Sequence, residues 1–417
     1  MTSSSLQRRL GLGDAVFIGL GSMIGAGVFA VWSPAADAAG TGLLIGLAIA
    51  AIVAFGNATS SAQLAAAHPT SGGTYAYGRA ELGPWWGFVA GWGFVVGKIA
   101  SCAAMALTFA AYAAPAGWER PVAIAAVVAL TAVNWFGVTR TAGAARVIVV
   151  VSLGALAAAV TAAFSADAAP GWFSGETLWE GGGYGILQSA GLLFFAFAGY
   201  ARIATMGEEV RDPRRVIPRA IVIAFLVALA VYAVVAVAVL SALGPTGVAA
   251  STEPVADAAA RSGWGWIAVV VRIGAAAASL GALLALIAGV SRTAFAMSRE
   301  GDLPRFLDRV HPRWGVPHRA ELAAGSVAVA LVALVDLRGA IGFSSFGVLL
   351  YYFVANVAAF RQGPDARRFP MALQIIGAIG CLVLAATLPW QSVVGGVIVV
   401  GAGVLYRGIR LRIARQD

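Results

Sequence analysis

Long apolar stretches recur along nearly the whole chain, and short polar segments that hold almost all of its charges separate them. A transmembrane helix needs about 20 mostly apolar residues. The apolar residues run continuously instead of alternating with polar ones, which excludes a transmembrane β-barrel. The pattern therefore predicts an all-α integral membrane protein with twelve transmembrane helices, at residues 13–39, 42–66, 85–114, 122–138, 144–164, 184–207, 217–243, 264–297, 320–335, 340–360, 373–388 and 392–406.

Composition and charge agree with this pattern. The 417 residues are 60% hydrophobic and 11% charged, with a net charge of +9. If the N-terminus is cytoplasmic, 22 of the 28 Lys and Arg residues fall on the inner side, three on the outer side and three within spans. This asymmetry follows the positive-inside rule, so we interpret the positive charge as membrane topology and not as a nucleic-acid surface. It predicts a multi-pass protein of the plasma (inner) membrane with both termini in the cytoplasm, and no loop is long enough for a second domain.

The first span has glycines at 19, 21, 25 and 27, crowded near its middle. Each glycine weakens a helix by about 1 kcal/mol relative to alanine. Backbone freed from a helix is tolerated in hydrocarbon only where it faces protein, water or a ligand, and its bare N–H groups suit a carboxylate. The alternative is a close-packing face, because Gly21 and Gly25 have the small-xxx-small spacing.

The sixth span has a matching feature, with Gly199 mid-span after a run of aromatic residues. Interrupted helices at corresponding positions of two halves are typical of the central site of a transporter. Helices 1–5 (13–164) and 6–10 (184–360) could then be inverted repeats within a single domain, 1–417. Helices 11 and 12 (371–406) would be two additional helices that follow the repeats.

Four stretches carry a family resemblance: GSMIGAGVF from Gly21, PTSGGTYAY from Pro69, FAFAGY from Phe195 with EEVRDPRRVIPRA after it, and SREGDLP from Ser298 with PHRA after it. With these, the chain resembles the amino acid–polyamine–organocation (APC) superfamily over helices 1 to 10. The resemblance implies the leucine-transporter-type fold with broken helices 1 and 6.

The resemblance also implies a substrate site in the two breaks. The substrate carboxylate would meet the amides near Gly25, Ala26 and Gly27, and the ammonium would meet carbonyls near Met23, Phe195 and Ala198. Phe195 matches a gate position, and Gly199 would give the second break its freedom. The predicted substrate-binding residues are Met23, Ile24, Gly25, Ala26, Gly27, Phe195, Ala196, Ala198 and Gly199.

The chain departs from the family in the residues that couple transport to an ion. Related proton-coupled members carry a lysine in helix 5, where this chain has none, and no sodium-site pair is evident in helix 8. Lys98, the only lysine, lies midway along helix 3, where a charge costs several kcal/mol unless it is partnered or faces water. Lys98 is therefore a candidate for proton coupling or for replacing a bound cation, and the alternative is a structural amine bonded to the carbonyls of a broken helix.

Three further charged residues are gating candidates. Arg202, in the inner half of helix 6, could pair with Asp14 or Glu208 as an inner gate, and the alternative is an arginine that snorkels to water. Arg272, near the outer end of helix 8, is expected to snorkel as well.

An enzyme is disfavoured, because the three histidines lie in loops and the chain has no HExxH motif and no acid pair within the membrane. No metal or cofactor is expected. The predicted function is secondary active transport of amino acids by alternating access, coupled to protons or working by exchange, in a monomer or homodimer. The central segments offer no acid, which favours a neutral or apolar substrate. The alternatives are a cationic amino acid or polyamine transporter and a non-transporting receptor or scaffold.

Overall fold

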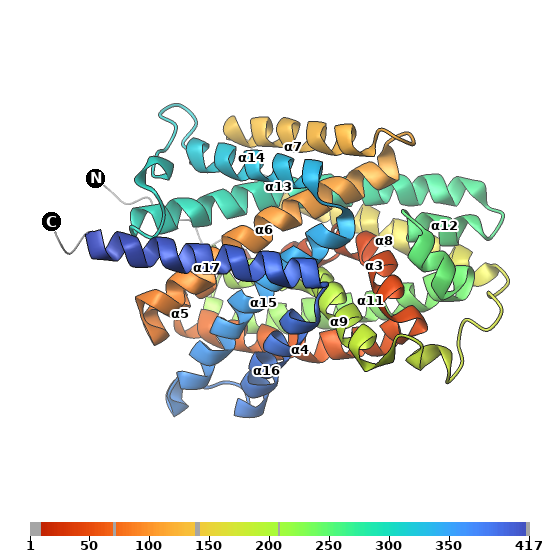
Figure 1. Cartoon of the computed structure of the whole chain (residues 1–417), viewed down its shortest axis with the longest axis horizontal. Helices are drawn as coiled ribbons and strands as arrows, with labels where there is room; N and C mark the ends of the chain where they lie inside the picture. The colour runs from red at the N-terminus through yellow and green to blue at the C-terminus, as the bar shows by residue number, and fades with distance from the viewer. Residues whose placement is uncertain (1–9, 70–71, 138–141, 207–208, 414–417) are drawn as a thin grey trace.

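The chain folds into a bundle of long helices that run mostly along the long axis of the molecule (Figure 1). The computed structural model describes residues 10–69, 72–137, 142–206 and 209–413, and within these ranges it contains no strand, only an isolated bridge between Leu10 and Val210. The all-helical membrane class is therefore confirmed.

The first half of the bundle begins with a helix in three pieces, α1 (Leu12–Met23), α2 (Gly27–Ala30) and α3 (Trp32–Ala39). The long helices α4 (Leu43–Ala67), α6 (Pro84–Ala113), α7 (Glu119–Trp135) and α8 (Ala142–Ser165) follow. A short helix, α5 (Gly73–Leu82), lies between α4 and α6, inside a segment that the sequence predicts as a loop.

The second half again begins with a broken helix, α9 (Gly182–Phe197), η3 (Ala198–Tyr200) and α10 (Ala201–Ala204). It continues with α11 (Pro213–Ala250), α12 (Pro254–Ala260), α13 (Gly265–Arg299), α14 (His318–Leu334) and α15 (Leu337–Arg361). The last two helices are α16 (Met371–Thr387) and α17 (Trp390–Ile413). Short 3-10 turns complete the connections: η1 (Gly40–Gly42), η2 (Thr177–Trp179), η4 (Arg305–Leu307) and η5 (Pro364–Ala366).

Nine segments of the described chain are long and apolar enough to cross a membrane. Three predicted spans do not reach that length, because α7, α14 and α16 have 17 residues each. At 1.5 Å per residue such a helix is about 25 Å long, at the lower limit for a bilayer core of about 30 Å. The structure therefore establishes a multi-pass helical membrane protein, and the count of twelve spans stays a prediction.

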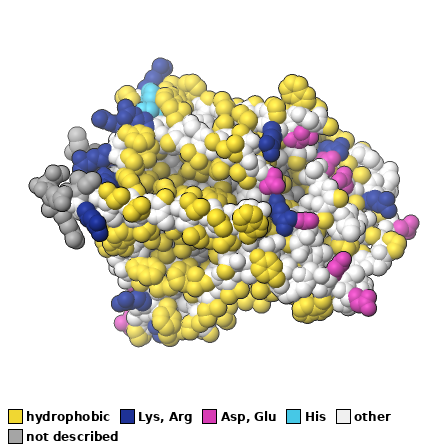
Figure 2. All heavy atoms as spheres, viewed as in Figure 1, with side chains coloured by type: hydrophobic (Ala, Val, Ile, Leu, Met, Phe, Trp, Pro, Cys, Tyr) yellow, Lys and Arg dark blue, Asp and Glu magenta, His cyan; other side chains and the backbone are white. Residues whose placement is uncertain are grey.

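Side-chain chemistry divides the surface into a central band and two ends. Figure 2 shows hydrophobic side chains over the middle of the visible face, Lys and Arg at its left end, and most of its Asp and Glu towards the right. Helices α8, α11, α13, α16 and α17 all carry exposed apolar residues, among them Val150, Leu226, Ile273, Ile379 and Ile398. We call the left end, where α5 and the last turns of α17 lie, the basic end, and the end with α12 the opposite end (Figures 1 and 2).

Candidate functional site: two broken helices in contact

The first break lies where the sequence predicts it. Helix α1 ends at Met23, Ile24 has the non-helical angles φ −83° and ψ 40°, and α2 begins at Gly27. All the residues from Met23 to Gly27 are buried. Within the described residues, the amides of Gly25, Ala26 and Gly27 donate no backbone hydrogen bond. Buried N–H groups are almost always paired, so these amides are available for a ligand.

The glycines of this break also allow close packing. A Cβ atom added at Gly27 would lie 2.8 Å from the Cα atom of Ala196 in α9, and one at Gly25 would lie 3.0 Å from the Cβ atom of Ala282 in α13. Both separations are too short for a real Cβ contact without movement. The packing interpretation and the ligand interpretation of these glycines are therefore compatible.

The second break is a 3-10 turn at Ala198–Tyr200, between α9 and α10. It lies directly against the first break, because a Cβ atom at Gly199 would overlap the carbonyl oxygen of Ser22. Phe195, Ala196 and Ala198 are buried beside it. The structure thus brings the two predicted sets of residues together.

Two tyrosines that sequence reasoning missed hold the carbonyls of these breaks. The single O–H group of Tyr232 in α11 is shared between two carbonyl oxygens, those of Met23 at 2.6 Å and Ala196 at 2.9 Å. The Tyr352 hydroxyl in α15 donates to the carbonyl oxygen of Ala198 at 3.3 Å. Tyr232 is a lone tyrosine within an apolar span, and Tyr352 follows Tyr351 in another. These are weak signals, and only the fold shows which carbonyls the hydroxyls reach.

Lys98 of α6 lies at the same place. Its side chain is buried, at 8% exposure, and its Nζ atom donates to the carbonyl oxygen of Ala198 at 3.4 Å. Among the described residues no carboxylate lies within 4.0 Å of Nζ. The contact is the one that the structural-amine alternative predicts, and it also places the ammonium group beside the breaks.

The gating candidates are arranged differently from the prediction. Asp14 forms an ion pair with Arg146 of α8 and not with Arg202. Arg202 donates to the hydroxyl of Thr205 at 3.3 Å. The proposed Asp14–Arg202 pair is therefore not made, because α8 offers Asp14 a nearer partner, and Glu208 lies outside the described residues. Arg272, expected only to snorkel, forms an ion pair with Glu253.

A cavity of about 120 Å³ opens between α7, α10, α13 and α14, beyond the breaks towards the basic end. Its walls carry Asn134, Arg202, Arg292 and Glu321, together with the α13 residues Leu284, Ala285, Ala288 and Gly289. We call it the inner cavity.

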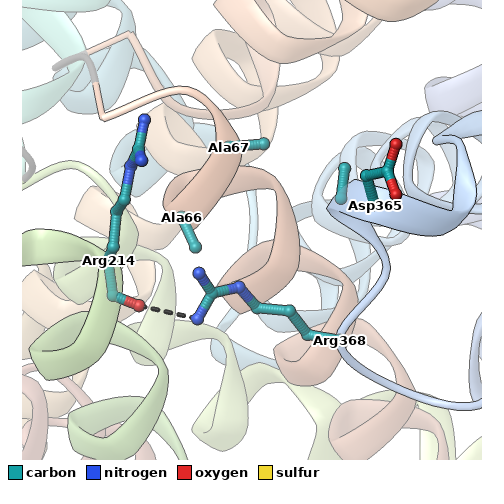
Figure 3. Close-up of a pocket in the computed structure, with 6 residues that line it drawn as sticks. Ala66, Ala67, Arg214, Asp365 and Arg368 are labelled. Atoms are coloured by element: carbon teal, nitrogen blue, oxygen red, sulfur yellow. Dashed lines mark hydrogen bonds between the residues drawn. The ribbon is translucent and has the colours of Figure 1, made fainter.

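A larger cavity, of about 320 Å³, lies away from the breaks beside the last turn of α4 (Figure 3). Arg214, Asp365 and Arg368 line it, and the Arg368 guanidinium donates to the carbonyl oxygen of Arg214 at 2.8 Å. Neither broken segment contributes to its walls, so volume alone does not identify the substrate site.

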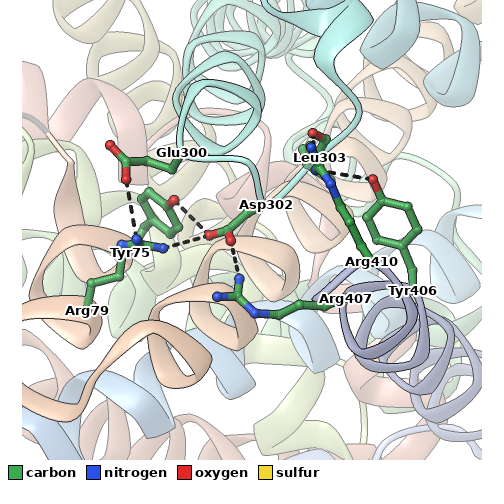
Figure 4. A network of polar contacts seen from close by, with 8 residues as sticks. All are labelled: Tyr75, Arg79, Glu300, Asp302, Leu303, Tyr406, Arg407 and Arg410. Atoms are coloured by element: carbon green, nitrogen blue, oxygen red, sulfur yellow. Dashed lines mark hydrogen bonds and ion pairs between the residues drawn. The ribbon is translucent and has the colours of Figure 1, made fainter. Parts of the chain in front are cut away.

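A buried ionic network joins α5, the segment after α13 and α17 at the basic end (Figure 4). The Asp302 carboxylate accepts hydrogen bonds from Tyr75 at 2.9 Å, from Arg79 at 3.0 Å and from Arg407, and Arg79 also pairs with Glu300 at 3.3 Å. Burial and the negative charge of Asp302 raise the pKa of Tyr75 above its ordinary value. Tyr75 therefore stays protonated and donates to Asp302, and the network fixes α5 and α17 to the end of α13.

Broken apolar helices that meet inside a bundle define this chain as a multi-pass membrane protein of the transporter type. The sequence profile of the family described as "Amino acid permease" matches residues 10–411, and the chain belongs to this family. The prediction of an APC-family permease is thereby confirmed.

Three relatives illustrate the range of the family. The chain is 58% identical over 412 residues to an uncharacterized transporter of Mycobacterium tuberculosis, covering 99% of this chain and 93% of that one. It is 26% identical to the branched-chain amino acid permease BcaP of Bacillus subtilis, over 94% of this chain and 90% of that protein. It is 28% identical to the cationic amino acid transporter 4 of Homo sapiens, over 85% of this chain and 59% of that protein. These relatives are named as transporters or permeases, not as enzymes.

Proposed function

We propose that this protein is a secondary active transporter that carries neutral, mainly apolar amino acids by alternating access. The observation that carries the proposal is the contact between the two breaks, where the buried amides of Gly25, Ala26 and Gly27 have no backbone partner in the described part of the chain. An amino acid carboxylate would satisfy these amides, and the helix dipole of α2 and α3 would favour its charge.

The apolar character of the breaks supports a neutral substrate. The two segments read MIGAG from Met23 and FAFAG from Phe195, without an acid that would neutralise a cationic side chain. Similarity to a branched-chain amino acid permease favours the same class. A cationic amino acid or polyamine is the second candidate, and similarity to a cationic amino acid transporter favours it.

We further propose the arrangement that the sequence predicts: twelve spans, inverted repeats over 13–164 and 184–360, and the basic end in the cytoplasm of a plasma membrane. The basic end carries the excess of arginine that inner loops require (Figure 2). The transporter would work by proton coupling or exchange, with Lys98 as the candidate coupling group.

Uptake and counterflow in proteoliposomes test the carrier proposal. We expect saturable uptake and accelerated counterflow when the vesicles are preloaded with unlabelled substrate. Linear, non-saturating flux would contradict a carrier, and the absence of flux for all twenty amino acids would favour a receptor or scaffold.

The substrate class is tested separately, by thermal stabilisation of the purified protein with each of the twenty amino acids and a diamine. A ligand that binds only the folded state raises its stability. Stabilisation by leucine, isoleucine or valine supports the neutral class. Stabilisation by arginine, lysine or the diamine alone would overturn it.

A further inference from the structure

The inner cavity lies next to the proposed substrate site along α13. Ala282 of α13 approaches Gly25 of the first break, and the cavity-lining residues of α13 follow from Leu284 to Arg292. At 1.5 Å per residue, Arg292 is about 15 Å further along the helix than Ala282. A substrate that leaves the breaks towards the basic end would therefore meet this cavity next.

Three charged side chains from three different helices line the cavity: Arg202 of α10, Arg292 of α13 and Glu321 of α14. Arg292 interacts electrostatically with both Arg202 and Glu321. Yet no two of the three form an ion pair within 4.0 Å among the described residues. Two positive charges and one negative charge thus share a small cavity without neutralising each other directly.

Of the three charges, that of Glu321 has the highest free-energy cost when it lacks an ion-pair partner. It is 2% exposed, and its Oε2 atom has no hydrogen-bond partner. An uncompensated buried carboxylate costs several kcal/mol, so such a group is retained where a ligand or a partner satisfies it at some stage of the working cycle. A cationic group that enters the cavity would satisfy the Glu321 carboxylate.

The two arginines that line the cavity are exposed and therefore open to an entering ligand. Among the described residues, Arg202 donates a hydrogen bond to the Thr205 hydroxyl and interacts electrostatically with Glu209, and Arg292 forms no hydrogen bond or ion pair. A guanidinium group binds a carboxylate through two parallel hydrogen bonds. The cavity therefore presents N–H donors for a carboxylate, from Arg202 and Arg292, and an acceptor for an ammonium, from Glu321.

We propose that the inner cavity is a second substrate subsite, in which Arg202 and Arg292 take the α-carboxylate of the amino acid and Glu321 takes its α-ammonium. The inference rests on the proposed transport function and deepens it. The subsite recognises the two groups that all α-amino acids share, so it holds the substrate between the breaks and the water at the basic end without selecting its side chain.

The test measures substrate affinity from each side of the membrane, in proteoliposomes in which the protein has a single orientation. The variants are Arg292→Gln and Glu321→Gln, and the matched control is Arg299→Gln, which removes an arginine from the end of the same helix outside the cavity. We expect the half-saturating substrate concentration at the basic end to rise about tenfold in both variants, equivalent to about 1.4 kcal/mol. The value at the opposite end stays unchanged, and the control changes neither.

An unchanged half-saturating concentration at the opposite end also shows that a variant is folded. Glu321→Asp keeps the charge and provides a milder second variant, for which we expect a smaller rise in the half-saturating concentration at the basic end. A competition experiment adds a chemical probe: the deamino analogue of the substrate, a simple carboxylic acid, should inhibit from the basic end in the wild type and lose that inhibition in Arg292→Gln.

Two results would overturn the subsite. Equal half-saturation for the wild type and both variants at the basic end would remove these residues from substrate binding. A flattened pH profile with unchanged half-saturation would assign Glu321 to proton transfer instead. In either case a transporting wild type leaves the proposed function intact, whereas a wild type that transports no amino acid overturns both proposals.

Discussion

Replacing Tyr232 by phenylalanine removes one hydroxyl and leaves the aromatic ring in place. The ring is fully buried and packs edge-on against Phe197, with centroids 5.0 Å apart, so phenylalanine fits the same space. The only loss is the O–H donor that the carbonyl oxygens of Met23 and Ala196 share. Because these carbonyls belong to the two broken helices, the substitution tests whether Tyr232 holds the breaks together.

The magnitude follows from the burial of the two acceptors. A buried group left without its partner costs about 1–3 kcal/mol. Neither carbonyl gains access to water, because Met23 and Ala196 are themselves buried. We therefore expect Tyr232→Phe to lower the free energy of unfolding by about 2 kcal/mol. We also expect it to weaken substrate binding, because the end of α1 is less firmly placed.

Equilibrium unfolding in mixed micelles, followed by tryptophan fluorescence, measures the first effect, and thermal stabilisation by substrate measures the second. The control is Tyr184→Phe, at an exposed tyrosine (59% exposure) near the start of α9. It removes the same atom from a side chain in contact with the surroundings and should change stability by less than about 0.5 kcal/mol. If Tyr232→Phe were as mild as this control, the hydroxyl would not be holding the breaks.

Three further outcomes are expected. Gly199→Ala forces a Cβ atom onto the Ser22 carbonyl oxygen and should cost at least about 1–3 kcal/mol of stability, with loss of transport. The control Gly154→Ala has open space around it and should leave transport unchanged in the same uptake assay. A fully active Gly199→Ala would contradict the contact between the breaks. Lys98→Met should abolish the dependence of uptake on an imposed pH gradient, and uptake that keeps this dependence would leave only the structural role. Arg407→Gln removes a buried partner of Asp302. It should lower the free energy of unfolding towards the lower end of about 3–5 kcal/mol, because other partners of Asp302 remain. Unfolding in the same micelles measures this loss, and a loss below about 1 kcal/mol would show that the remaining partners suffice.

The tyrosine and lysine contacts show which donors already occupy the carbonyls that the substrate ammonium would meet. In this arrangement Lys98 and the Tyr352 hydroxyl both donate to the Ala198 carbonyl oxygen, and Tyr232 donates to Met23. These are two of the carbonyls expected to receive the substrate ammonium. A carbonyl oxygen has two lone pairs, so an ammonium can join or displace these donors as the site fills.

The sequence by itself determined the membrane class, the position of both breaks and the family. These properties are local, because an apolar run of about 20 residues or a cluster of glycines in one helix acts on its own segment of backbone. The motifs that carry the resemblance are likewise contiguous. For the same reason the structure places Ile24–Ala26 and Ala198–Tyr200 outside regular α-helix, where the glycines predict it.

Only the tertiary structure decided which groups meet. The partner of Asp14 proved to be Arg146 and not Arg202, and Tyr232 reached the carbonyl oxygens of two different helices. Glu321, which no sequence motif singled out, faces a cavity that Arg202 and Arg292 also line. Such pairings depend on how helices far apart in the chain cross and rotate, and that depends on the packing of small and large side chains over the whole bundle.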